Sequence, residues 1–183
     1  FSITARAGGI IIDSYSKVNV YNLGTGNGYS VLDIVKAFDT ARAVKAEKEC
    51  YGAKILGVHS EGPFINPSKK GAQAEENILT PDADFILENA DIITSVTLAP
   101  EMDKDFETIK RIVSETGIVV SAGHTSADYD TMVKAIEAGV SHATHLFNAM
   151  SSFSHRAPGG TGALLFSDKV SCELICDGVH VHK

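Results

Sequence analysis

Polar side chains that could take part in catalysis or metal binding follow the short apolar runs of this sequence, at the point where each run ends. In chain order they are His59, Glu61, His124, His145, Asn148, Asp177 and His180. Two imidazoles and a carboxylate that converge from separate strands make a plausible ligand set for Zn²⁺ or a similar divalent ion. Such an ion would lower the pKa of a bound water and polarise a carbonyl. Glu61, His124 and His145 are therefore candidate metal ligands, although no HExxH or CxxC motif fixes their geometry.

Two segments that follow candidate ligands contain further recognition groups. EGPFINPSKKGAQ (61–73) has the Pro and Gly content of a shaped loop rather than a helix. HLFNAMSSFSHRAPGGTGAL (145–164) contains Asn148, which can hydrogen-bond a sugar or an amide. It also contains Arg156, whose planar guanidinium suits a phosphate or a carboxylate. An ordinary surface arginine is the alternative interpretation of Arg156.

Buried parallel strands that alternate with helices are expected to position these side chains. Runs rich in Val and Ile, with too few polar interruptions for one-sided strands, occupy residues 54–59, 91–100, 117–124, 139–147 and 169–181. Apolar periodicity and cap residues predict helices over 80–90, 100–117 and 125–139, with Thr80 and Thr125 or Ser126 as amino-terminal caps. The alternation implies βαβ units, whose strands carry functional groups at their carboxyl ends. The predicted fold class is α/β, a partial (β/α)8 TIM barrel of about five βα units.

Composition and charge argue against several classes of protein. The chain has 183 residues and a formal net charge of -7 at pH 7, whereas nucleic-acid and membrane-surface binders usually carry a basic patch. No apolar run approaches the ~18 residues that span a bilayer, and the first residues lack a signal-peptide pattern. The three cysteines (Cys50, Cys172 and Cys176) are expected to be buried thiols in a reducing compartment. We therefore expect a cytoplasmic protein without nucleic-acid or membrane partners.

Four stretches in a fixed order carry a resemblance to a known family. They are GVHSEGPFINPSKKGAQ, VVSAGHTSADYD, HATHLFNAMSSFSHRAPG and ICDGVHV. Through them, residues from about 39 to 183 closely resemble the N-acetylglucosamine-6-phosphate deacetylases of the amidohydrolase superfamily. The resemblance implies hydrolysis of the N-acetyl group of N-acetylglucosamine 6-phosphate to acetate and glucosamine 6-phosphate. It also implies a divalent metal cofactor, Zn²⁺ first and Fe²⁺, Mn²⁺ or Co²⁺ as alternatives, and homo-oligomeric full-length relatives.

The same resemblance implies roles for individual residues. Glu61, His124 and His145 would be the metal ligands, and His180 would act in catalysis near the scissile amide. The implied substrate-binding residues are Ala72, Gln73, Asn148, Ala149, Arg156 and His180, with Arg156 on the phosphate and Gln73 where some members have a histidine. Members also carry an HxH-type metal motif on the first barrel strand and a general-base aspartate on the eighth. The sequence has no histidine before residue 50 and ends at Lys183, so we expect an incomplete, inactive fragment with exposed strand edges prone to self-association.

The first part of the chain resembles a different family. VNVYNLGTGNGYSVLDIVKAF (18–38) is similar to a UDP-glucose 4-epimerase segment that lies away from that family's catalytic residues. Its GTGNG is neither a GxGxxG fingerprint nor a P-loop. The predicted organisation is a foreign segment over 1–38 and an incomplete amidohydrolase barrel over 39–183. The alternative functions are a truncated α/β domain that binds metal or sugar phosphate without turnover, another amidohydrolase, and an epimerase.

Overall fold

The strands form one six-stranded sheet whose order follows the sequence. The computed structural model describes residues 2–4, 31–47 and 54–183. The strands are β1 (Ser2–Thr4), β2 (Val58–Glu61), β3 (Ile93–Leu98), β4 (Val119–Ala122), β5 (His142–Ala143) and β6 (Ser171–Cys172). β2 to β6 pair in parallel with their sequence neighbours, and β1 pairs antiparallel with β2. Parallel strands in sequence order, joined through helices, form an arc of a (β/α)8 barrel, and the predicted fold class is confirmed.

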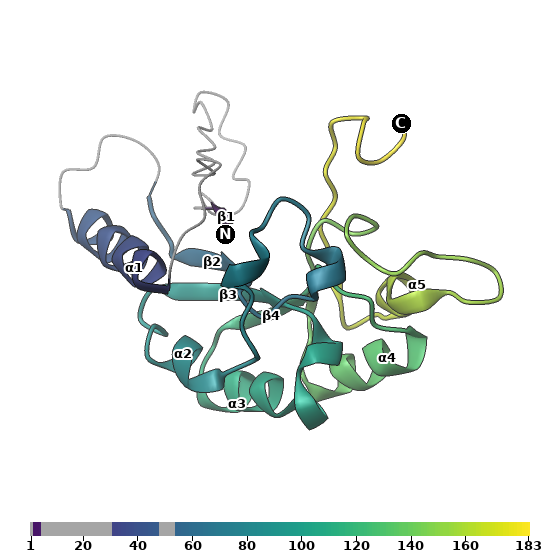
Figure 1. Ribbon diagram of the computed structural model, residues 1–183, viewed down its shortest axis with the longest axis horizontal. Coiled ribbons are helices and arrows are strands. Elements are labelled where there is room, and N and C mark those ends of the chain that lie inside the picture. The colour runs from purple at the N-terminus through teal and green to yellow at the C-terminus, as the bar shows by residue number, and fades with distance from the viewer. Residues whose placement is uncertain (1, 5–30, 48–53) are drawn as a thin grey trace.

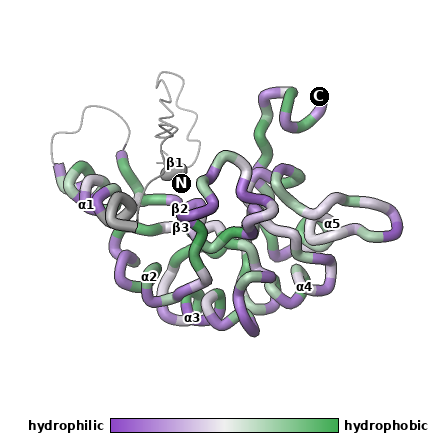
Figure 2. Tube along the Cα trace, in the orientation of Figure 1, coloured by the Kyte–Doolittle hydropathy of each residue, from purple (hydrophilic) through white to green (hydrophobic). Residues whose placement is uncertain are grey.

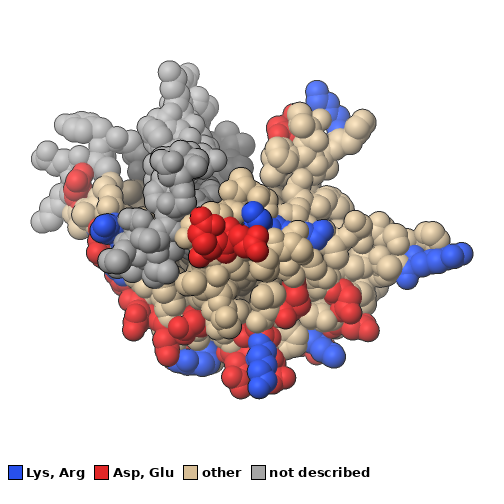
Figure 3. All heavy atoms as spheres, in the orientation of Figure 1, with Lys and Arg blue, Asp and Glu red and all other residues tan. Residues whose placement is uncertain are grey.

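Helices cover the outer side of this arc (Figure 1). The helices are α1 (Val31–Ala46), α2 (Ala83–Leu87), α3 (Glu107–Glu115), α4 (Tyr129–Ala138) and α5 (Gly159–Phe166). α2, α3 and α4 lie on one side of the sheet, whereas the C-terminal residues lie towards the other. Figure 2 places the most hydrophobic stretches in and around the strands. On the face drawn in Figure 3, acidic and basic side chains alternate along the helical side.

The core lies between the sheet and these helices. Ile109 and Ile112 of α3 are fully buried, as the predicted apolar stripe requires. Phe85 of α2 packs against Phe38 and Phe64, with ring centroids 6.3 and 6.0 Å apart. Each such side chain contributes about 1.5–3 kcal/mol when it is removed from water. The strands are therefore held against a packed helical layer.

The helix ends differ from the predictions because carboxylates, rather than hydroxyls, cap the helices. α2 begins after Asp82, whose carboxylate accepts a hydrogen bond from the Asp84 amide at 2.9 Å. α4 begins after Asp128, which accepts from the Thr131 amide at 2.8 Å. The predicted caps Thr80 and Thr125 or Ser126 are therefore wrong. α4 does end at Gly139, whose φ of 129° suits glycine.

The predicted helix over 100–117 is shorter in the structure. Residues 100–106 form two 3₁₀ turns, and Asp105 and Phe106 have positive φ values of 54° and 57°. The buried carboxylate of Asp103 accepts hydrogen bonds from the amides of Thr108 and Ile109 at 3.1 and 2.9 Å. This carboxylate supplies acceptors for the free amides at the start of α3, so the regular helix begins only at Glu107.

The predicted buried strand over 169–181 is largely wrong. Only Ser171 and Cys172 are in a strand, and both are exposed. The C-terminal arm, defined here as residues 173–183, has no helix or strand, and its Val179 is 85% exposed. Among the described residues no strand pairs with the outer edge of β6, so this run lacks the second neighbour that buries a parallel strand. For the same reason Cys172 and Cys176 are exposed rather than buried, and Cys50 lies outside the described residues.

Helix α1 crosses the predicted join between residues 38 and 39. Phe38 is fully buried in the core. Arg42, one turn further on, donates to both carboxylate oxygens of Asp91 at 2.7 Å and to Asn89 at 2.9 Å. These contacts tie α1 to the turn before β3. The GTGNG stretch lies outside the described residues, and the domain boundary stays a prediction.

Candidate metal centre

Glu61, His124 and His145 meet where three strands end. Glu61 closes β2, His124 follows β4 through Gly123, and His145 follows β5. The Nε2 atom of His124 is 2.6 Å from Glu61 Oε1, and the Nε2 atom of His145 is 3.3 Å from the same oxygen. The two Nε2 atoms are 3.1 Å apart, and all the potential ligand atoms lie within 4.8 Å of one another. The structure therefore brings together the three side chains that the sequence singled out.

The outer nitrogens of both imidazoles point to backbone carbonyl oxygens. His124 Nδ1 is 2.7 Å from the Lys69 oxygen, and His145 Nδ1 is 3.2 Å from the Asn148 oxygen. A carbonyl oxygen can only accept, so each Nδ1–H donates to its carbonyl and the Nε2 atom of each ring is turned towards the cluster. Metal-binding histidines commonly present Nε2 in this way, and the carbonyls are the kind of outer partner that orients them.

The electrostatics of the cluster favour a cation at its centre. Glu61 and His145 keep only 15% and 17% of their side-chain surface exposed. Burial would raise the pKa of Glu61, but its hydrogen bonds with His124 and His145 hold that pKa far below the usual range. Burial lowers the pKa of His145, but Glu61 outweighs this effect and raises it. One buried, ionised carboxylate and two imidazole Nε2 atoms converge here, and this donor set fits a divalent metal.

The backbone around the two histidines is strained. His124 and His145 have φ values of 50° and 36°, and Phe147 and Ala149 have φ values of 76° and 50°. Residues with a Cβ rarely adopt such values, and they persist only where the surroundings hold them. The Ala149 oxygen accepts the Thr125 amide at 3.0 Å, which links the loops after β4 and β5. Strain concentrated in two adjacent loops is typical of a functional site.

A buried chain of hydroxyl groups lies in the strands beneath the cluster. Thr144 Oγ1 is 2.7 Å from Thr97 Oγ1 and 2.6 Å from Ser121 Oγ. His59, which the sequence also singled out, is 6% exposed, and its Nε2 is 2.6 Å from Thr97 Oγ1. His59 therefore belongs to the layer that supports the cluster from below. A cavity of about 150 Å³ opens beside it, lined also by Glu61, His145, Glu173 and three neighbours.

The loop after β2 brings Gln73 back to the cluster. Gln73 is 9% exposed, and its Nε2 lies 3.5 Å from the Glu61 carbonyl oxygen. A Cβ at Gly62 would lie 3.1 Å from Gln73 Oε1, and Gly62 has a φ of +87°. The loop therefore needs a glycine there to bring Gln73 so close. Ala72, the neighbouring candidate, is exposed.

The remaining substrate candidates lie in the loop after β5. Asn148 donates from Nδ2 to the His145 and Leu146 oxygens at 3.4 and 3.3 Å. The Asn148 side-chain amide therefore stabilises its own loop, and Ala149 is the next residue in the sequence. Arg156 is exposed in the stretch that precedes α5. The Asn148 backbone oxygen thus contacts His145, whereas no described contact joins the exposed Arg156 to the cluster.

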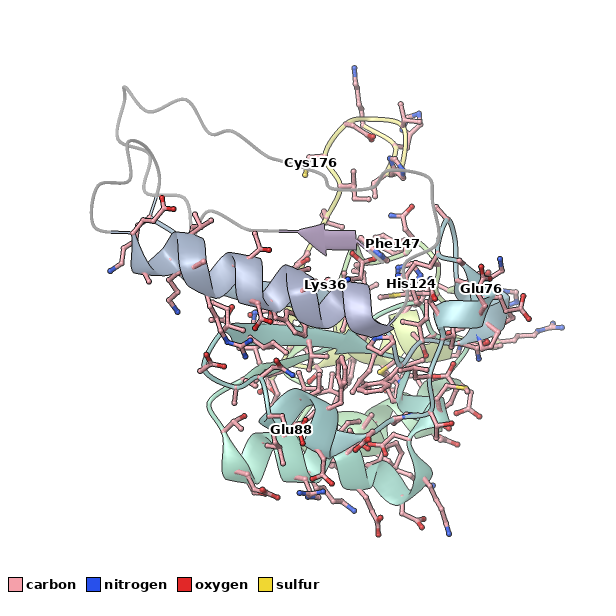
Figure 4. The ribbon with its side chains drawn as sticks, turned by 60° about the vertical axis from the view of Figure 1, so that its left-hand side comes forward. Lys36, Glu76, Glu88, His124, Phe147 and Cys176 are labelled. Atoms are coloured by element: carbon pink, nitrogen blue, oxygen red, sulfur yellow. The ribbon has the colours of Figure 1, made fainter. Side chains whose placement is uncertain are left out.

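His180 is not part of the cluster in this structure. Its ring Nδ1 is 2.6 Å from Asp177 Oδ2, and half of its side-chain surface is exposed. Backbone amides of Val179 and His180 also bond Asp177, and together with the His180 ring they lower its pKa to about 2. In Figure 4 the arm that carries Cys176 rises away from the region of His124 and Phe147. Asp177 and His180 therefore form a local turn within the arm.

Glu101 is a functional candidate that the sequence interpretation missed. It follows β3 in the 3₁₀ turn Pro100–Met102. Its carboxylate accepts hydrogen bonds from Asn66 Nδ2 at 2.9 Å and from the Ser126 amide at 2.5 Å, and also from the Thr125 hydroxyl. The only available signal was its position just after a predicted strand, where the other candidates also lie.

Comparison with known proteins agrees with this geometry. The model of the amidohydrolase family matches residues 30–183. This chain belongs to the amidohydrolase family. Amidohydrolases of this family depend on a metal, as the cluster of Glu61, His124 and His145 suggests. The match begins inside the segment predicted to be foreign, and the epimerase resemblance of residues 18–38 finds no support in the comparisons.

Its relatives include deacetylases of amino-sugar phosphates. The chain is 45% identical over 156 residues to the N-acetylglucosamine-6-phosphate deacetylase of Bacillus subtilis, covering 82% of this chain and 39% of that protein. It is 37% identical to the N-acetylgalactosamine-6-phosphate deacetylase of Shewanella, covering 83% of this chain and 39% of the relative. The amidohydrolase chain thus spans about two fifths of the length of these curated relatives.

Solved amidohydrolase structures share the fold. The N-acetylglucosamine-6-phosphate deacetylase of Pasteurella multocida matches with a TM-score of 0.72 and 40% identity, over 84% of this chain and 40% of that one. A Mycobacterium smegmatis deacetylase mutant in complex with N-acetyl-D-glucosamine-6-phosphate matches with a TM-score of 0.75 and 36% identity, over 85% and 40%. Within the described part of the chain, no helix is long and apolar enough to cross a membrane.

Proposed function

We propose that this chain is part of a metal-dependent deacetylase that converts N-acetylglucosamine 6-phosphate to glucosamine 6-phosphate and acetate. The observation that carries the proposal is the cluster of Glu61, His124 and His145, with both imidazole Nε2 atoms turned towards one carboxylate oxygen. The names of the similar proteins supply the substrate class. The loop with Asn148 and Arg156 favours an amino-sugar phosphate over the substrates of other amidohydrolases.

The proposed cofactor is Zn²⁺, with Fe²⁺, Mn²⁺ or Co²⁺ as alternatives. Glu61 Oε1 and the Nε2 atoms of His124 and His145 would hold it, because these atoms already converge and their outer partners are in place. When bound, the ion would lower the pKa of a water molecule and polarise the carbonyl of the acetamido group. The cavity beside Glu61 and His145 offers space for that group.

The neighbouring loops would orient the substrate. Asn148 and the backbone of Ala149 would hold the sugar, and Arg156 would bind the phosphate through its planar guanidinium. Ala72 and Gln73, in the loop after β2, would line one border of the substrate site. His180 would contact the substrate near the scissile amide, which requires the C-terminal arm to bring it to the cluster. Because a phosphorylated sugar crosses apolar membranes poorly, we propose a cytoplasmic location, and a homo-oligomeric full-length enzyme.

Two preparations test the proposal. The 183-residue chain, stripped of metal, should bind Zn²⁺ in calorimetry and equilibrium dialysis. The second is a chimera in which residues 54–183 replace the matching stretch of the Bacillus subtilis relative, which should release acetate from N-acetylglucosamine 6-phosphate. A chimera that folds and binds Zn²⁺ without releasing acetate would favour the alternative of a domain that binds without turnover. A chain without affinity for any of the four metals would refute the proposed function.

Arg156→Ala in the chimera tests the phosphate assignment. Its KM for N-acetylglucosamine 6-phosphate should rise about tenfold or more with little change in kcat, because the guanidinium binds ground state and transition state alike. Lys169→Ala is a control, since Lys169 is also an exposed cation but lies beyond α5. Equal turnover of N-acetylglucosamine with and without its 6-phosphate would contradict the role of Arg156.

A further inference from the structure

Glu101 joins three loops around the proposed metal centre. It follows β3, yet it bonds Asn66 in the loop after β2, and Thr125 and Ser126 in the loop after β4. Its own backbone is held firmly, because Ala99 and Pro100 are buried and the Ala99 amide donates to the Phe64 oxygen at 2.8 Å. A carboxylate fixed on one strand end thus binds the two loops on either side of it.

The partners of Glu101 surround the backbone of His124. Thr125 and Ser126 directly follow His124, and the Asn66 amide donates to the His124 carbonyl oxygen at 3.0 Å. Lys69, whose oxygen accepts from His124 Nδ1, is anchored in turn by its amide, which donates to the Asn66 oxygen at 2.9 Å. Both the backbone and the ring of His124 are therefore linked to residues that Glu101 holds.

All the described partners of Glu101 are neutral donors. Among the residues that the structure describes, no lysine or arginine forms an ion pair with this carboxylate. Hydrogen bonds to an ionised acceptor are about twice as strong as those between neutral groups. The negative charge is thus used to fix loop geometry rather than to neutralise a nearby cation.

We infer that Glu101 is a positioning residue that pre-organises the metal centre by holding His124 in place before the ion binds. The inference rests on the proposed function of the Glu61, His124 and His145 cluster. The Nε2 atom of His124 lies 2.6 Å from Glu61 Oε1, and the φ of 50° puts the His124 backbone in the left-handed region, which is strained for a residue with a Cβ. Such a backbone conformation persists only where the surroundings hold it, and the Glu101 bonds to Asn66, Thr125 and Ser126 provide that support.

Two substitutions with a matched control test this role. Glu101→Ala removes both oxygens. Glu101→Gln keeps the shape and one acceptor oxygen for Asn66 and Ser126, but it faces the Thr125 hydroxyl with an amide group. Glu107→Gln is the control, since Glu107 is an exposed carboxylate in the first turn of α3. Melting temperature and far-UV circular dichroism identify any variant that does not fold, and Glu101→Gln keeps the test valid if Glu101→Ala fails.

Hydrogen exchange of the metal-free chain provides the first readout. In both Glu101 variants the amides of residues 123–128 should exchange faster, whereas those of α3 should be unchanged. Unchanged protection of residues 123–128 in a folded Glu101→Gln variant would overturn the inference. This result does not depend on metal binding, so the inference is tested even if the unsubstituted chain binds no ion and the proposed function fails.

Metal affinity provides the second readout. Glu101→Ala should weaken Zn²⁺ binding by about 10–100-fold, the usual effect of removing a group that orients ligands, with a smaller loss for Glu101→Gln. The visible spectrum of bound Co²⁺ should change in both, because it reports coordination geometry. Zn²⁺ binding by folded Glu101 variants within about twofold of the unsubstituted chain would contradict the positioning role. Glu107→Gln should match the unsubstituted chain throughout.

Discussion

One sequence pattern, an apolar run followed by a histidine or a carboxylate, occurs in two kinds of segment that fold differently. It occurs in the loops after β2, β4 and β5, and it also occurs in the C-terminal arm. In the loops, Thr125 is fully buried and His124 is 7% exposed. In the arm, Val179 is 85% exposed and His180 bonds only within its own turn among the contacts described. This difference in burial shows that the pattern brings polar side chains together only where packed neighbours fix the end of the strand.

The neighbours of each segment explain the difference. β4 has β3 and β5 on its two sides and packs against α3, so it is held on three sides. The arm follows β6, which pairs only with β5 in the described sheet. Fixing a backbone residue costs about 1–2 kcal/mol, and only burial or shared hydrogen bonds offset that cost. The predictions below test this contrast, from the largest expected effect to the smallest.

Removal of a proposed metal ligand from the cluster should have the largest effect. Glu61→Gln or His145→Ala should lower Zn²⁺ affinity by more than about 100-fold, beyond the loss expected for an orienting group. Calorimetry on the metal-free chain measures the change. His155→Ala is the control, because His155 is exposed in the loop before α5. Equal losses in the control and in the ligand variants would show that the cluster is no more specialised than the surface.

A pair of apolar truncations compares the packed body with the arm. Ile112→Ala removes a fully buried side chain of α3 and should lower the free energy of unfolding by about 2–5 kcal/mol. Val179→Ala in the arm should change it by less than about 0.5 kcal/mol. Urea titration followed by circular dichroism measures both. A large effect at Val179 would mean that the arm packs on the body in solution.

Substitution of Asp103 tests how firmly the 3₁₀ turns before α3 are held. Asp103→Ala leaves the Thr108 and Ile109 amides without their acceptors and should cost about 1–3 kcal/mol of unfolding free energy. Asp103→Asn retains one acceptor oxygen and should cost less. The same urea titration distinguishes them. No loss in Asp103→Ala would show that water replaces the carboxylate and that this turn is not a fixed support.

The smallest effect should come from protonation of Asp177 in the arm. Backbone amides of His180 and Val179, and the His180 ring, hold its pKa at about 2, below the ordinary value near 3.9. A depressed folded pKa means that the turn is stabilised above about pH 4, and that this stabilisation is lost as the pH falls towards 2. The amide resonance of His180 should follow this titration in NMR spectra. A midpoint near 4 would show that the turn is not formed in solution.

The sequence identified the barrel class and the three clustered side chains for a physical reason. Strands 91–100 and 117–124 are apolar enough to be buried on both faces, and parallel strands place their carboxyl ends at one edge. Glu61, His124 and His145 were therefore predicted to converge, and they do. Their metal role, and the roles assigned to Gln73, Asn148 and Arg156, stay predictions.

What the sequence could not provide depends on contacts between distant residues. Glu101 looks like any surface glutamate in its own segment, and its three partners come from positions 66, 125 and 126. The positive φ values at His124 and His145 have no local signature, because glycine would be the expected residue there. The caps at Asp82 and Asp128 were missed because neighbouring threonine and serine fit the same helix-start pattern.

The sheet ends on short strands at both of its margins, and this has a consequence for contacts between molecules. β1 has three residues and β6 has two, whereas the six-residue β3 lies inside. A strand that templates a fibril needs a row of about six free backbone positions, and neither margin offers one within the described residues. In contrast to the self-association expected from the sequence, these short edge strands lead us to expect that the folded chain resists edge-to-edge growth, with no thioflavin signal on incubation. A positive signal would show that longer strands become accessible when the fold opens.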